Sequence, residues 1–322
     1  MFGLEDDDWL AAKQRVERKG KTALETFQGL IVPVIVVPQP ALEGAAGDLV
    51  QANVDFVNAM MEKAALLPGE FAPQSFYSHY ADYYLSQVLN GGHGQYARNS
   101  KWSETVVRAA AFGLSAMGAT QHLAILERFA AIMNGKDHKR ARAILEGGGF
   151  GWVDPEVEAL DEELYALQTD SPLAPLNAAW LKSLPQLMVV PANEYAVALE
   201  RIAASNPLRT PRQAESRRKA ATMMASDPLH STVIKLCAKG GVAYDGLTAG
   251  VALSHDRPHY WTWGVKTNIG VCYAVFREQK RLLGRKYDVI LVSRVPGKKV
   301  LTAMNISRRA YEGIVPRDMR EA

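Results

Sequence analysis

The stretch that decides the fold is Asn90-Gly91-Gly92-His93-Gly94-Gln95-Tyr96-Ala97-Arg98-Asn99. It follows residues 74–89, where apolar and aromatic side chains recur at helical spacing. A glycine pair after a helix permits the left-handed conformation that ends it and lets a second helix approach closely. Gln95 and Asn99 are four residues apart, so we expect their amides to share one helix face and to hydrogen-bond the neighbouring backbone. The stretch therefore predicts a junction of two helices.

Helical periodicity dominates the first two thirds of the chain. The predicted helices cover residues 46–66, 74–89, 103–117, 119–134, 137–146, 155–168, 173–184 and 192–204, with glycines and prolines between them. Residues 9–25 predict a further, exposed helix. Residues 31–44 contain three prolines, which indicate an extended connector or at most an edge strand.

The last third of the chain has a different pattern. Residues 259–265, 270–276, 287–292 and 300–306 are rich in β-branched and aromatic residues, and Pro296-Gly297 between the last two indicates a hairpin. The basic segment 209–219 predicts an exposed linker that enters a helix, with a domain boundary near Asn206. We expect a mainly α protein: an N-terminal helix and connector (1–45), a helical domain (46–206) and a smaller basic α+β domain (207–322).

Charge is unevenly distributed along the 322 residues. Residues 1–200 hold 25 acids against 15 bases, a net of −10, whereas residues 201–322 hold 9 acids against 22 bases, a net of +13. Such asymmetry favours a second part that attracts phosphate or an acidic protein, or two parts that attract each other; it is also compatible with a role in solubility alone.

The composition also places the chain in a compartment. No apolar run approaches the roughly 20 residues that cross a bilayer, and the acidic start of the chain is unlike a secretory signal. We therefore expect a cytoplasmic protein without membrane contact, whose two cysteines are free buried thiols.

The glycine junction resembles a motif of a bacterial family of unknown function typified by DNA-mimic protein nineteen. The resemblance covers about residues 50–200 and is carried by Asn90, Gly91, Gly92, Gln95, Tyr96 and Asn99, together with Gly118-Ala119 and the stretch 160–165. His93 departs from the family, whose members carry an aromatic residue there. The resemblance implies a helical fold and, as in the typifying member, binding to a DNA-binding protein through an acidic surface that imitates phosphates.

One acidic cluster is dense enough to suggest such a surface. It comprises Asp154, Glu156, Glu158, Asp161, Glu162 and Glu163, at the start of the helix predicted after Asp154-Pro155. The alternative is structural, because acids in a first turn stabilise the helix dipole. The opening motif, residues 90–99, likewise has two interpretations: a structural helix junction whose amides satisfy buried backbone groups, or a site for a ligand or partner.

The basic domain offers a candidate nucleic-acid surface. If residues 259–265 form a strand, Trp261 and Trp263 share one face and Tyr260 and Thr262 the other. Aromatic residues flanked by bases stack and neutralise single-stranded nucleic acid, although they also build the cores of small β domains. The candidate contacts are Arg257, Tyr260, Trp261, Trp263, Lys266, Arg277, Lys280 and Arg281.

Catalytic chemistry has little support in the sequence. The glycines at 147–149 lack the strand and the Lys-Ser or Lys-Thr of a phosphate loop. His255, His259, Cys237 and Cys272 are too loosely spaced to indicate a zinc site. We assign no catalytic residue, metal or cofactor, and expect a non-enzymatic interaction protein that regulates a nucleic-acid-binding protein partner through the acidic surface. The alternatives are nucleic-acid binding by residues 207–322 and, less favoured, an enzyme with an interdomain site.

Overall fold

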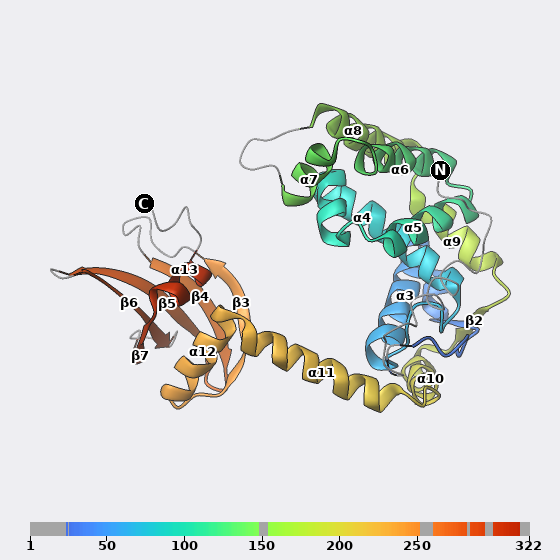
Figure 1. The fold of residues 1–322 in the computed structure, drawn as a ribbon. Helices are drawn as coiled ribbons and strands as arrows, with labels where there is room; N and C mark the ends of the chain where they lie inside the picture. Colours follow the sequence, from blue (N-terminus) through green and yellow to red (C-terminus); the bar gives the residue numbers. More distant parts are fainter. Residues whose placement is uncertain are drawn as a thin grey trace. The chain divides into compact units, whose positions relative to one another are not determined.

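The computed structural model describes residues 24, 26–147, 154–251, 260–281, 284–293 and 299–315. The helix predicted over residues 9–25 falls almost entirely outside this part of the chain. The chain divides into two compact units, residues 1–213 and 214–322, and the fold is mainly α with a smaller α+β end, as expected (Figure 1). The domain limits predicted from the sequence stay a prediction, because compactness does not show which part folds alone.

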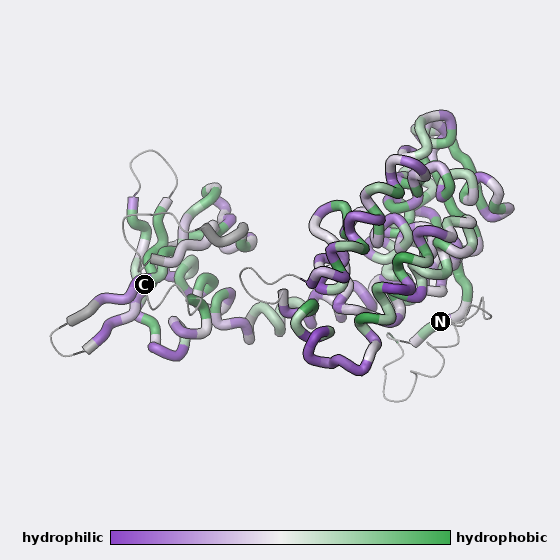
Figure 2. The backbone as a smooth tube through the Cα atoms, turned by 90° about the horizontal axis from the view of Figure 1, so that it is seen from above, coloured by the Kyte–Doolittle hydropathy of each residue, from purple (hydrophilic) through white to green (hydrophobic). Residues whose placement is uncertain are grey.

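The first unit is built from helices around two cores. Its elements are β1 (Ile35–Pro38), α2 (Gln39–Glu43), α3 (Ala46–Asn58), the π-helical turn η2 (Ala59–Lys63), α4 (Pro73–Ser100), α5 (Glu104–Ala116), α6 (Thr120–Met133), α7 (His138–Glu146), α8 (Pro155–Asp170), α9 (Leu173–Ser183), β2 (Leu187–Val190) and α10 (Ala192–Ala204). One core joins β1, α3 and the start of α4 to α9 and α10, and the other lies among α4 to α9. In Figure 2 apolar and polar residues alternate along these helices, as expected for helices with one buried face.

The segment expected to be a connector belongs to the first core. Ile35, Val36 and Val37 are fully buried, and β1 pairs in parallel with β2. The sequence did not predict β2. Proline is confined to the last residue of β1, Pro38, so the ladder keeps its donors. Parallel pairing of strands far apart in sequence leaves little local signal, because it depends on packing between distant segments.

α11 (Arg209–Ser226) crosses the division between the two units. Its basic start was expected to be an exposed linker, which is wrong for Arg212, because this residue is only 7% exposed. Residues 216–224 of the same helix are exposed.

The second unit is an antiparallel sheet with helices on one face. Strands β3 (Tyr244–Val251), β4 (Tyr260–Thr267), β5 (Gly270–Arg281), β6 (Gly284–Ser293) and β7 (Val300–Ile306) follow one another in the sheet. α12 (Pro228–Lys239) and α13 (Arg308–Ile314) pack on it (Figure 1). Apolar residues of both helices complete its core. Among the described residues, no helix is long and apolar enough to cross a membrane.

Candidate functional site

The glycine pair breaks α4 as predicted. Gly91 is extended, with φ 178° and ψ 35°, and Gly92 has φ 74° and ψ 176°, a region that only glycine visits readily. Asp161 of α8 lies against Gly92, and a Cβ on this glycine would overlap the carboxylate. Gly92 is therefore needed for two reasons: it adopts the backbone conformation of the break, and it leaves space for α8 to pack closely.

His93 follows the break and is completely buried. Its backbone N–H donates to Asp161 Oδ1 at 2.7 Å, its ring Nδ1 lies 2.5 Å from the same oxygen, and its Nε2 lies 2.8 Å from the Tyr84 hydroxyl. An imidazole that donates from Nδ1 to the carboxylate and accepts at Nε2 from the tyrosine hydroxyl satisfies both ring contacts, and the backbone N–H makes the third. Burial raises the pKa of Tyr84 well above its usual value, which keeps the hydroxyl proton available for this bond.

The motif amides bind a side chain rather than the backbone, so the sequence expectation was wrong on this point. Gln95 and Asn99 both donate to Gln87 Oε1, at 3.3 Å and 2.6 Å, across the break in α4. The two amides do share one face, because both reach the same acceptor. Tyr96 is fully buried beside Tyr84 and Trp102, whereas Asn90 is exposed at the break. Most of the motif thus holds the two halves of α4 together.

Asp154 begins the acidic cluster and caps α8. Its carboxylate accepts from the backbone N–H groups of Glu156 and Val157 and from Arg140, whose Nε and Nη2 lie 2.6 Å and 2.7 Å from its two oxygens. The hydrogen bonds from Arg140 lower the pKa of Asp154, against the opposing effect of burial. Asp154 therefore stabilises the helix start, the structural role that the sequence left open.

The rest of the cluster is partly neutralised. Glu156 also pairs with Arg140, Glu163 pairs with both terminal nitrogens of Arg128, and Asp161 binds His93. Glu158 and Glu162 are exposed and have no ion-pair partner within the described ranges. They lie one turn apart on α8, so the exposed acidic surface is narrower than the sequence suggests.

The tryptophans of the second unit share one face of β4, as the alternation predicted. Trp261 and Trp263 are half-buried, pack edge to face with ring centres 6.3 Å apart, and contact the core of this unit. Arg277 donates to both oxygens of Asp288, its neighbour on β6, at 2.8 Å each. These contacts engage three of the candidate nucleic-acid residues in the unit itself. Lys266 remains exposed.

Other sequence candidates fall outside the described residues. Arg257, His255 and His259 lie in the undescribed segment 252–259, and the side chains of Tyr260, Lys280 and Arg281 are not described either. The two cysteines, Cys237 and Cys272, are free and buried. In the part of the chain that the structure describes, no three His, Cys, Asp or Glu side chains gather as a metal site.

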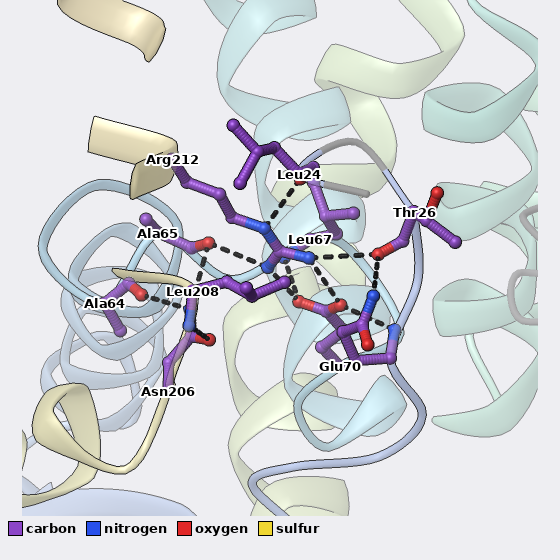
Figure 3. A network of polar contacts seen from close by, with 10 residues as sticks. Leu24, Thr26, Ala64, Ala65, Leu67, Glu70, Asn206, Leu208 and Arg212 are labelled. Atoms are coloured by element: carbon purple, nitrogen blue, oxygen red, sulfur yellow. Dashed lines mark hydrogen bonds and ion pairs between the residues drawn. The ribbon is translucent and has the colours of Figure 1, made fainter. Parts of the chain in front are cut away.

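A buried ion pair between Arg212 and Glu70 was missed from the sequence. Nη1 and Nη2 of Arg212 lie 2.6 Å and 3.0 Å from the carboxylate oxygens, and the guanidinium also donates to the carbonyl groups of Leu24, Thr26 and Ala65 (Figure 3). Glu70, which is completely buried, accepts in addition from the backbone of Gln28 and Leu67.

This network fixes the start of α11 on the first unit. Asn206 donates to the carbonyl of Ala64, and Arg209 and Gln213 donate to that of Lys63, at the end of the π-helical turn. The last carbonyl groups of a helical turn have no partner within it, and these side chains supply donors to the carbonyls of Lys63 and Ala64. In the sequence, only Arg212 could have indicated this buried network. It was missed because the residue lies in a basic run that is typical of a solvent-exposed helix.

Comparison with known proteins identifies part of the chain. Residues 69–184 match the family model described as DMP19-like protein. No curated protein matches the chain, and no solved structure does. The match begins just before Glu70 and includes the broken helix α4, the acids of α8 and all of α9. Residues 69–184 of this chain therefore form a DMP19-like domain.

Proposed function

We propose that this protein is a non-enzymatic interaction protein whose DMP19-like domain binds a nucleic-acid-binding partner through the exposed acids of α8. The observation that carries the proposal is the position of Glu158 and Glu162 within the family match: exposed, one turn apart, and without ion-pair partners in the described chain. Glu163, although paired with Arg128, is also exposed and adds to the same helix.

The density of negative charge determines how tightly such a surface binds a partner that normally binds DNA. Acids four residues apart on a helix are separated by about 6 Å along its axis, whereas one DNA strand carries a phosphate about every 3.4 Å. Two arginines, Arg128 and Arg140, further reduce the field around α8. The surface therefore imitates a short phosphate segment, and we expect moderate affinity that falls as salt increases.

The test uses the full chain as bait. Copurification and mass spectrometry compare the wild type with Glu158→Lys/Glu162→Lys and with the control Glu62→Lys/Glu194→Lys, which reverses two exposed acids elsewhere on the same unit. The expected partner binds nucleic acid, is retained by the control, and is lost from the α8 variant. A competing oligonucleotide should also release it. The proposal is rejected if both variants copurify the partner equally, or if the oligonucleotide does not release the partner.

A further inference from the structure

The fold brings basic residues from two separate segments of the second unit together, the start of β6 and the start of α13. An open depression of about 640 Å³ is lined by Arg285, Lys286, Tyr287, Asn305, Ile306 and Arg308. Tyr287 of β6 is paired with Ile306 of β7, and Arg285 and Arg308 lie two residues beyond this pair, one on each segment. Residues far apart in sequence thus place three cations around one depression.

The two arginines keep hydrogen-bonding capacity for a ligand. Arg285 Nη1 lies 2.6 Å from Glu278, and Arg308 Nε lies 2.6 Å from Glu312, so each ion pair engages one nitrogen of the guanidinium. A guanidinium has five N–H donors. The arginine side chains are 58% and 75% exposed, and Lys286 has no ion pair within the described residues. Three cations therefore face two acids, which leaves the depression positive.

The surrounding unit has the same sign. Residues 214–322 hold 19 lysines and arginines against 9 acids, a net of +10. Arginine recognises phosphate through its planar fork, and the exposed amide of Asn305 adds a donor at the rim. Tyr287 is only 9% exposed and packs on Tyr311, so it offers no platform for stacking a base.

We propose that this depression binds the phosphate backbone of nucleic acid without reading base sequence. The binding surface lies where β6 begins and β7 ends, and its lining does not include the tryptophans of β4. Its lining residues all belong to the second unit, and the proposal does not depend on the proposed function of the α8 acids. Because its contacts are ionic, the affinity falls steeply with salt.

The experiment measures binding of the full chain to a fluorescent oligothymidine of about 20 nucleotides across a salt series. Arg285→Gln/Arg308→Gln should weaken binding and make the slope of log affinity against log salt shallower by about 1.4, the loss of two phosphate contacts to a single strand. Lys235→Gln, an exposed position on α12 outside the depression, is the control and should have at most a small effect.

A second variant tests the proposal independently of folding. Glu312→Gln removes the acid paired with Arg308, and the expected result is tighter binding, which misfolding would not produce. Absence of binding at low salt, equal weakening by Lys235→Gln, or unchanged affinity in Glu312→Gln overturns the proposal. The proposal is also overturned if polyglutamate binds as tightly as the oligonucleotide and with the same dependence on Arg285 and Arg308. The depression would then bind acidic protein rather than nucleic acid.

Discussion

The carboxylate of Asp161 binds both the backbone N–H and the ring Nδ1 of His93, a residue 68 positions earlier in the chain. At the helix break formed by Gly91 and Gly92, this contact gives the free backbone N–H of His93 an acceptor from another helix, α8. An anion at the first N–H groups of a helix is stabilised by the helix dipole, and here it also orients a buried imidazole. One acid of the supposed interaction surface thus belongs to the interior of the domain.

Asp161→Ala should destabilise the first unit. The substitution leaves the buried N–H groups of His93 without their acceptor, at a cost of about 1–3 kcal/mol in the free energy of unfolding. Urea unfolding followed by circular dichroism measures the loss. Glu162→Gln changes the exposed neighbouring acid and should stay within about 0.5 kcal/mol of the wild type. Equal stability of Asp161→Ala and wild type would show that the contact contributes nothing.

Gly92→Ala tests the backbone at the break. Alanine at φ 74° and ψ 176° is strained, and its Cβ would overlap Asp161, so we expect a loss of more than about 2 kcal/mol. Gly118 has a similar φ of 72° but open space where a methyl group would lie, so Gly118→Ala should cost about 1 kcal/mol. Thermal and urea unfolding of the two variants rank them. The reverse order would contradict the close approach of α8.

The ion pair of Arg212 and Glu70 should behave as one unit. Arg212→Met leaves a buried carboxylate without its countercharge, and Glu70→Gln leaves a buried guanidinium; either change should cost about 3–5 kcal/mol. The double variant should lose clearly less than the sum of the two, which a double-mutant cycle by urea unfolding measures. Arg212→Lys should not restore stability, because one ammonium group cannot replace five directed donors. Additive losses would show that the two groups do not interact.

These contacts also show how far the sequence reaches. Helical periodicity and glycine punctuation predicted α3 to α10 and the break in α4, because both are local properties of the chain. The partner of His93 lies 68 positions away and that of Arg212 lies 142 away, so no local pattern reveals either. For the same reason, counting acids along the sequence overestimated the negative charge of the cluster on α8. The count includes Asp154 and Glu163, but it cannot show that Arg140 and Arg128 pair with them in the folded protein.

His79 gives the stability of the first unit a dependence on pH. Burial lowers the pKa of His79 to about 4, from a usual value of 6.5. Between these two values the unfolded chain binds more protons than the folded one, so stability falls as the pH decreases through this window. For this group alone the loss between about pH 7 and pH 5 is at most about 2 kcal/mol. Burial lowers the pKa of His122 too, which adds a loss of the same sign.

The variant His79→Phe isolates this contribution. Phenylalanine keeps an aromatic ring beside Tyr80 but cannot take up a proton, so its free energy of unfolding should decrease less than that of the wild type as the pH falls. Urea unfolding at several pH values between about 7 and 5 measures the difference in slope. His138→Phe, at an exposed position on α7, serves as the control. Parallel pH profiles for wild type and His79→Phe would mean that the imidazole stays accessible to protons in the folded domain.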